Sequence, residues 1–366
     1  MRLPEAGWRE DFTYDAPVLE DRPVRVVFGA GSLHQVGREA AALGRRALLI
    51  AGPHEDEAAG VVAAHLGADL AGRLRDVAQH VPTDLADEAT RRASRSGADV
   101  LLAVGGGSAT GLAKAIALRT GLPILAVPTT YAGSEMTPIW GLTDSQGKTT
   151  GRDPRVLPRT VLYDPALTVS LPPPLSGASG LNALAHALEA LYAPDATPLL
   201  TTVAEEALRT LAEALPVVVA QPDDRDARSQ ALFGAWLAGW ALGGTTMGLH
   251  HKLAHVLGGT YGLPHAGVHS ALLPQVAAFN AAAAPEAFTR AARALRVDAP
   301  GDVGQVLFDL ATKVGAPTSL ADLGLASDAI DDVAAVVAAS TVANPRPAVE
   351  AELVHLLRAA FIGTRP

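Results

Sequence analysis

Histidines cluster in one short stretch of this 366-residue chain. Five of the eleven lie within twenty residues, at His250, His251, His255, His265 and His269. A sixth, His186, follows Asn182 by four residues, and His255 follows His251 by the same interval. Residues four apart share one face of a helix, so each pair is expected to point the same way. Paired imidazoles predict either a transition-metal site or acid–base chemistry.

Position 182 bears on the choice between these two chemistries. An aspartate there would complete a good metal cage with the histidines, because its carboxylate is an anionic ligand. The chain carries Asn182 instead, whose side chain offers only a neutral carbonyl oxygen. We therefore expect a histidine-lined pocket that works without a metal.

A glycine-rich loop predicts a nucleotide site. Residues Gly105, Gly106, Gly107 and Ser108 follow an apolar strand and open a helix, and a second polar turn supplies Thr129, Thr130 and Ser134. Glycines let backbone amides approach a pyrophosphate at a helix N-terminus, and both turns are expected at the carboxyl edge of a sheet. A plain strand-to-helix turn is the alternative. His80, just ahead of this region, is a further candidate for the cofactor cleft.

The choice of dinucleotide stays open. After the apolar strand near residue 51, where a carboxylate would favour NAD, the chain runs Gly52-Pro53-His54-Glu55. Glu55 or Asp56 is one candidate for a ribose hydroxyl, but the turn also has room for a 2′-phosphate. We therefore expect NADH or NADPH, with Gly52 at the turn.

Two kinds of pattern divide the chain. Up to about residue 166, short apolar runs at residues 24–28, 47–51, 100–104 and 124–127 alternate with amphipathic stretches, which predicts a doubly wound, Rossmann-like parallel sheet. After Pro172-Pro173-Pro174 the pattern is helical throughout. We predict an α/β domain over 1–168, an all-α domain over 169–366, and an active site in the cleft between them.

The composition excludes several classes of function. The net charge of −9 gives no footprint for nucleic acid. No run of eighteen apolar residues occurs, so a membrane span is not expected. The first eleven residues lack the apolar segment of a secretory signal, and the chain has no cysteine. These features favour a cytoplasmic enzyme.

The motifs resemble those of the iron-containing alcohol dehydrogenase superfamily, and within it the maleylacetate reductases. The matching segments are residues 28–32, 105–114, 128–138, 148–154, 179–183, 250–252 and 344–347. The resemblance implies a dehydroquinate synthase-like fold and a homodimer. Metal ligands of the superfamily map onto Asn182, His186, His251 and His265. The reductases are similar to this chain in carrying asparagine at the first position and in working without a metal, and Gly111 replaces the usual aspartate.

The same resemblance implies a reaction and roles for the site residues. Maleylacetate reductases reduce the C=C bond of maleylacetate to 3-oxoadipate with NADH or NADPH in aromatic degradation. Histidines can stabilise the enolate and supply its proton, so His251 and His255 are the leading donors, with His186, His265 and Asn182 shaping the pocket. The substrate is a dicarboxylate, for which Lys252, Arg152 and Arg346 are candidate cations and Tyr131 a further contact.

Two departures from the reductase pattern keep alternatives open. Gly267 and Val268 stand where the reductases carry glutamate and threonine, and Gln275 replaces a histidine. One alternative is therefore a reductase-like enzyme recruited to another unsaturated acid or ketone, in secondary metabolism for example. The other is a metal-dependent alcohol dehydrogenase in which Asn182 still binds the ion.

Overall fold

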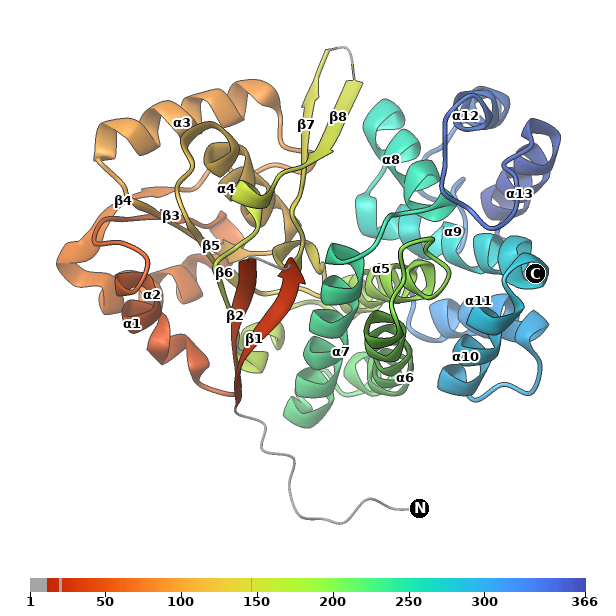
Figure 1. Cartoon of the computed structure of the whole chain (residues 1–366), viewed down its shortest axis with the longest axis horizontal. Coiled ribbons are helices and arrows are strands. Elements are labelled where there is room, and N and C mark those ends of the chain that lie inside the picture. Colours follow the sequence, from red (N-terminus) through yellow and green to blue (C-terminus); the bar gives the residue numbers. More distant parts are fainter. Residues whose placement is uncertain (1–11, 20–21, 146) are drawn as a thin grey trace.

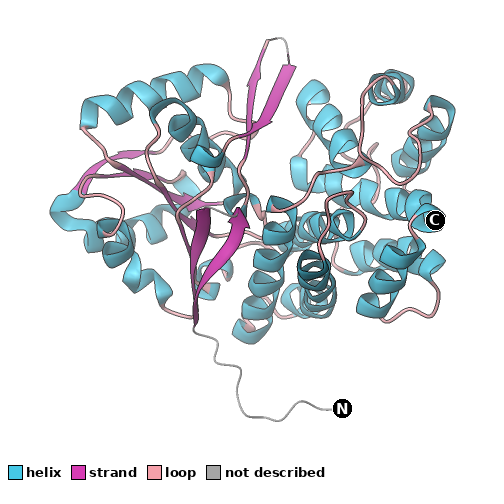
Figure 2. Ribbon diagram, viewed as in Figure 1, coloured by secondary structure: helices cyan, strands magenta, loops and turns pink. Residues whose placement is uncertain are grey.

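The computed structural model describes residues 12–19, 22–145 and 147–366. An α/β half and a helical half lie side by side, as Figure 1 shows, and Figure 2 shows that the strands are confined to the first. This arrangement confirms the predicted fold class. The N-terminal stretch used to argue against a secretory signal lies outside the described residues.

The main sheet has seven strands in the order β1-β2-β9-β6-β5-β3-β4. Its strands are β1 (Phe12–Leu19), β2 (Arg22–Phe28), β3 (Ala47–Ile50), β4 (Leu70–Leu74), β5 (Val100–Gly105), β6 (Ile124–Pro128) and β9 (Thr160–Tyr163). All neighbours pair in parallel except β1, which runs antiparallel to β2 at one edge. The four apolar runs of the sequence are β2, β3, β5 and β6, so those predictions are confirmed.

Helices cover both faces of this sheet, because its central strands are apolar on both sides. The helices are α1 (Val36–Ala41), α2 (Asp56–Leu66), α3 (Thr83–Ser96) and α4 (Gly107–Thr120). Alternate residues of β3 divide between the two layers: Leu49 packs with Val62 of α2, whereas Ile50 packs with Ile116 of α4. The carboxyl ends of β5 and β6 are thereby held in a rigid frame.

A two-stranded hairpin, β7 (Ile139–Asp144) and β8 (Gly147–Arg152), leaves the α/β half and rises beside the helical half (Figure 1). This hairpin was not predicted from the sequence. Its partly exposed pattern lacks the apolar runs that identified β2, β3, β5 and β6. The hairpin matters because it brings Lys148 to the boundary between the halves.

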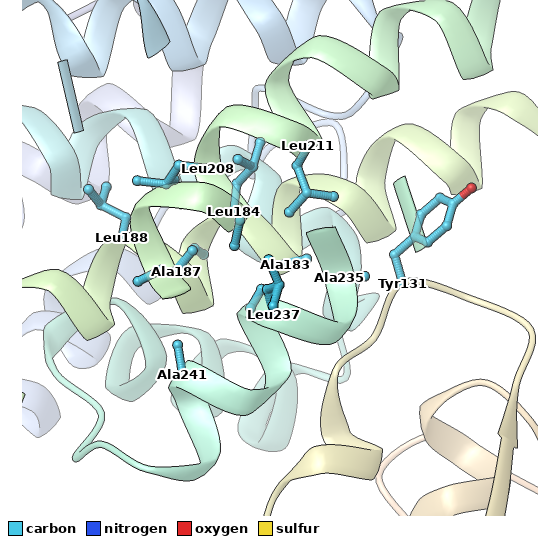
Figure 3. Close-up of a cluster of buried hydrophobic side chains, with 14 of the residues drawn as sticks. Tyr131, Ala183, Leu184, Ala187, Leu188, Leu208, Leu211, Ala235, Leu237 and Ala241 are labelled. Carbon is cyan, nitrogen blue, oxygen red and sulfur yellow. The ribbon is translucent and has the colours of Figure 1, made fainter. Parts of the chain in front are cut away.

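The second half is helical from residue 173 onward, as predicted. Its helices are α5 (Pro173–Leu191), α6 (Pro198–Ala220), α7 (Arg225–Gly243), α8 (Leu249–Tyr261), α9 (His265–Asn280), α10 (Pro285–Leu295), α11 (Val303–Lys313), α12 (Ala329–Ala338) and α13 (Glu350–Ile362). Figure 3 shows leucines and alanines of α5, α6 and α7 packed together, with Tyr131 from the loop after β6 at their edge. Each fully buried leucine contributes about 2 kcal/mol to this core. No described helix has the length and apolar character needed to cross a membrane.

Candidate active site

A cleft of about 540 Å³ separates the two halves. Its α/β side is formed by the ends of β5 and β6, the start of α4 and the hairpin, and its helical side by α5, α8 and α9. Four of the predicted nucleotide residues on the first side, Gly105 to Ser108, line it, as do Thr130, Ser134 and His80. Five predicted residues on the second side line it as well: Asn182, His186, His251, His255 and His265.

The glycine loop has the geometry of a phosphate cradle. Strand β5 ends at Gly105, whose φ of 141° favours glycine, and Gly106 is the N-cap of α4. A Cβ atom at Gly106 would lie 2.9 Å from Cγ2 of Thr130, so no side chain fits between the two turns. The unpaired N–H groups at the start of α4 therefore face the cleft without obstruction, and they suit a pyrophosphate.

Lys114 stabilises the segment that follows the second polar turn, residues 134–139. Its Nζ donates to the carbonyl oxygens of Ser134, Thr137 and Ile139 and to Oγ1 of Thr137, at 2.6 to 3.0 Å. Burial lowers the pKa of Lys114 to about 7, and the nearby Glu135 opposes that shift. This buried ammonium has a structural role, because its donors are used by the turn.

Glu55 stands beside the loop at the end of β3. Its half-buried carboxylate accepts a hydrogen bond of 3.3 Å from Oγ1 of Thr129, and burial raises its pKa. Glu55 lines the cleft, whereas the predicted Gly52 and Thr129 are not part of the lining and support it from behind.

His80 lies in a strained turn. His80 and Val81 have φ values of 61° and 45°, which side chains with a Cβ rarely adopt. Thr143 of β7 stabilises the turn, since its Oγ1 donates to the His80 carbonyl at 2.8 Å and its N–H to that of Val81. The His80 ring lies 6.3 Å from that of His265, so the turn reaches across the cleft.

Two of the predicted histidines form a buried hydrogen-bonded chain. Nδ1 of His251 contacts Oε2 of Glu189 at 2.5 Å, and Nε2 of His251 lies 2.8 Å from Nδ1 of His186. Nε2 of His186 is 3.1 Å from the carbonyl oxygen of Ala132. The carboxylate and the carbonyl only accept, so an N–H of His251 donates to Glu189 and an N–H of His186 donates to Ala132.

Glu189 is a site residue that the sequence reasoning missed. Burial alone would raise its pKa, but the charge and hydrogen bond of His251 lower that pKa to about 2. Its oxygens also accept from the backbone N–H groups of Gly248 and His250, at the start of α8. The signal that was available is position, because Glu189 follows His186 by one helical turn on α5.

His255 and His265 differ from this pair because their rings make no hydrogen bond to the described protein residues. Both are only half-buried and line the cleft. Burial, followed by the charge of Lys148, lowers the pKa of each well below the usual range. In the free cleft these two imidazoles are therefore neutral, with open nitrogens.

His250 and His269, which the sequence analysis placed in the cluster without a role, are fully buried behind this wall. Nε2 of His250 lies 2.8 Å from Nδ1 of His269.

The residues at the four superfamily ligand positions do not fit a transition-metal ion here. Both ring nitrogens of His186 and of His251 are engaged in the chain, and the two that face each other are 2.8 Å apart. A tetrahedral ion at about 2 Å from each would hold them about 3.3 Å apart. Among the described residues no group of three or more histidines or carboxylates is arranged to hold an ion.

The structure does not bring the other predicted substrate residues to the cleft. Arg152 donates to the carbonyl oxygens of Gly243 and Thr245 and fastens the hairpin to the end of α7. Arg346 pairs with Glu352 and stacks on the ring of Phe279. Lys252 lies on α8 but does not line the cleft.

Tyr131 is fully buried in the core of Figure 3, and its hydroxyl contacts Arg228 at 3.3 Å. Contacts elsewhere explain the placement of three of these residues. Arg152 binds backbone carbonyls, Arg346 pairs with a carboxylate, and Tyr131 lies in the core. Lys252 lies on α8 outside the lining of the cleft.

The two departures from the reductase pattern also lie away from the cleft. A Cβ at Gly267 would meet Leu323 at 2.9 Å, and Nε2 of Gln275 donates to the carbonyl of Thr364 at 2.5 Å. Neither residue lines the cleft. They adjust how α9 packs, so they give no direct reason for a different substrate.

Comparison with known proteins agrees with this geometry. The family model for iron-containing alcohol dehydrogenase matches residues 23–165, and the model for the C-terminal part of that family matches residues 176–361. A maleylacetate reductase of Sphingobium indicum is 50% identical over 95% of this chain and 98% of its own, and one of Burkholderia cepacia is 50% identical over 96% and 99%.

Among solved structures, maleylacetate reductase from Rhizobium sp. strain MTP-10005 superposes with a TM-score of 0.88 at 44% identity, covering 98% of this chain and 100% of that one. The match extends through both halves and includes the cleft. The chain belongs to the iron-containing alcohol dehydrogenase family and, within it, groups with the maleylacetate reductases.

Proposed function

We propose that this chain uses NADH or NADPH to reduce the C=C bond of maleylacetate, giving 3-oxoadipate, and does so without a metal. The observation that carries the proposal is the state of the helical wall. His186 and His251 are bonded to each other and to Glu189, whereas His255 stays open to the cleft opposite the glycine loop. That arrangement suits proton transfer rather than metal ligation.

The coenzyme site is assigned to the α/β wall. Gly105, Gly106, Gly107 and Ser108 would hold the pyrophosphate, with Thr130 and Ser134 within the same edge of the cleft. Gly106 supports this fit, because a side chain there would collide with Thr130 and close the cradle. When bound, the coenzyme supplies the hydride.

Side chains of the helical wall can stabilise the negative charge that develops on the substrate during reduction. Adding hydride to a C=C bond conjugated with a ketone places negative charge on the ketone oxygen, and a carbon then takes a proton. The open nitrogens of His255 and His265 can donate hydrogen bonds to that oxygen. A bound carboxylate beside His255 would favour its protonated form, which makes His255 the proton donor of this proposal. The hydrogen-bonded chain Glu189–His251–His186 fixes the side chains of α5 and α8 relative to each other.

Three wider features belong to the same proposal. Residues 1–168 and 169–366 act as separate domains with the active site between them. The enzyme works in the cytoplasm. It functions as a homodimer on a small dicarboxylate and binds neither nucleic acid nor membranes.

The experiment is an assay with isotopic labelling. Purified protein is mixed with maleylacetate and coenzyme carrying deuterium at the transferable position, and the product is identified by NMR. The proposal expects 3-oxoadipate with deuterium on a former alkene carbon. Deuterium on a carbinol carbon would instead show carbonyl reduction, the chemistry of an alcohol dehydrogenase, and would refute the proposal.

A further inference from the structure

Two lysines and no arginines are found among the described residues that line the cleft, and their surroundings are opposite. Nζ of Lys114 is surrounded by four oxygen acceptors. Lys148 of β8 is also part of the lining, but its ammonium has neither a hydrogen bond nor an ion pair with any described residue. Among the described residues of the lining, Lys148 is therefore the cation whose donors remain free.

The stem of Lys148 packs between the two walls, although its ammonium has no ionic partner among the described residues. Its stem passes close to the backbone of both walls, because a Cβ at Gly141 would lie 3.2 Å from its Cε and one at Gly259 would lie 2.8 Å from its Cβ. Gly259 belongs to α8 and Gly141 to β7, so the side chain bridges the hairpin and the helical wall. The residue is half-buried, and this burial is unfavourable for a charge that no anion of the described residues compensates.

The groups that face Lys148 are neutral imidazoles. Burial, together with the charge of Lys148, lowers the pKa of three histidines, His80, His255 and His265. All three imidazoles are neutral in the free cleft. None of the ion pairs among the described residues includes Lys148. An anionic ligand is the missing partner, because it would pair with the ammonium and accept hydrogen bonds from open imidazoles at the same time.

We propose that Lys148 binds one carboxylate of the substrate and thereby selects a dicarboxylate. The assignment rests on the proposed function, and it replaces the cations expected from sequence with one that lies in the cleft. Lys148 also places the bound carboxylate beside His255, so binding of the carboxylate favours protonation of that imidazole. The hairpin then serves as the part of the α/β half that recognises substrate rather than coenzyme.

The test compares Lys148→Met and Lys148→Arg with wild type, and uses Lys313→Met, an exposed residue of α11, as the matched control. Loss of a charge-assisted hydrogen bond should raise KM for maleylacetate about 10- to 100-fold in Lys148→Met. The Kd of NADH, measured by fluorescence without substrate, should change less than about 2-fold. Lys148→Arg should recover most of the affinity, because it restores the charge.

Inhibition separates a charge contact from a structural role. Wild type should bind 3-oxoadipate more tightly than its neutral dimethyl ester, and Lys148→Met should lose most of that preference while binding the ester as before. The assignment is overturned if KM stays within about 2-fold of wild type, if the ester weakens as much as the diacid, or if arginine fails to rescue. If wild type does not turn over maleylacetate, the proposed function fails, whereas the dissociation constants of the diacid and the ester, measured by direct titration, still decide the role of Lys148.

Discussion

The two walls of the cleft are built on different principles. The α/β wall presents backbone: a glycine at each turn, the unpaired amides of α4, and a lysine beneath whose donors are all used. The helical wall presents side chains, and its histidines divide into a pair that is bonded within the wall and a pair that is open. Under the proposed function, the pyrophosphate binds where side chains are absent, and proton transfer depends on which imidazole nitrogens are left free.

Removing an open imidazole is the strongest test of that division. His255→Asn should lower kcat by about 10²- to 10⁴-fold, the usual contribution of a positioned acid, with little change in the Kd of NADH. Steady-state kinetics with maleylacetate measures the first quantity and fluorescence titration the second. His355→Asn, on the exposed side of α13, is the control and should keep wild-type rates. A fully active His255→Asn enzyme would show that His255 is not the proton donor.

Breaking the bonded pair should act first on stability. Glu189→Gln removes the carboxylate from a buried ion pair with His251, so we expect the free energy of unfolding to fall by about 3 kcal/mol. Denaturant unfolding measures this change. Glu286→Gln in the first turn of α10 should cost less than about 1 kcal/mol. Equal losses in the two variants would argue against a special role for the pair.

The α/β wall can be tested by filling it. Gly106→Ala places a methyl group against Thr130 and in the path of the pyrophosphate, which should weaken NADH binding about 10- to 100-fold. Gly60→Ala on α2 meets no atom within 4 Å and should leave binding unchanged. Fluorescence titration of both variants sharpens the comparison, and unaltered binding by Gly106→Ala would place the coenzyme elsewhere.

Glu55 offers a smaller, more specific effect on the same wall. A carboxylate after β3 suits ribose hydroxyls and repels a 2′-phosphate, so the enzyme should prefer NADH. Glu55→Gln should raise the ratio of kcat/KM for NADPH to that for NADH about 10-fold. Glu57→Gln, exposed on α2, is the matched control. A ratio that does not move would remove Glu55 from coenzyme selection.

The smallest effect is expected outside both walls. Arg346 pairs with Glu352 and stacks on Phe279, so Arg346→Gln should change KM for maleylacetate by less than about 2-fold. A large rise in KM would return Arg346 to the substrate site and would contradict the placement described above.

Local patterns predicted the fold well, and they also identified residues that line the cleft. The apolar runs of β3, β5 and β6 and the glycines at 105–107 are signals within a few residues, and the spacing of Asn182 with His186 already placed both on one face. The partners of those residues were harder to predict. Glu189 meets His251 across 62 residues, and Lys148 reaches the cleft only because an unpredicted hairpin brings it there.

Residue type alone did not indicate which of the predicted substrate contacts reach the cleft. Arg152 and Arg346 carry suitable charges, but backbone carbonyls and a carboxylate bind them. Tyr131 lies in the protein core with its hydroxyl against Arg228. Lys148 gave no signal of its own beyond lying in a matching segment. Tertiary contacts decide whether a cation is free, and those contacts could not be predicted from the single sequence.

Reduction of the substrate without a metal can be tested by one paired measurement. Protein is treated with chelator, and its iron and zinc content and its turnover of maleylacetate are determined on the same sample. We expect unchanged turnover at a metal content far below one ion per chain. Activity that disappears with the metal and returns when one ion per chain is restored would contradict it.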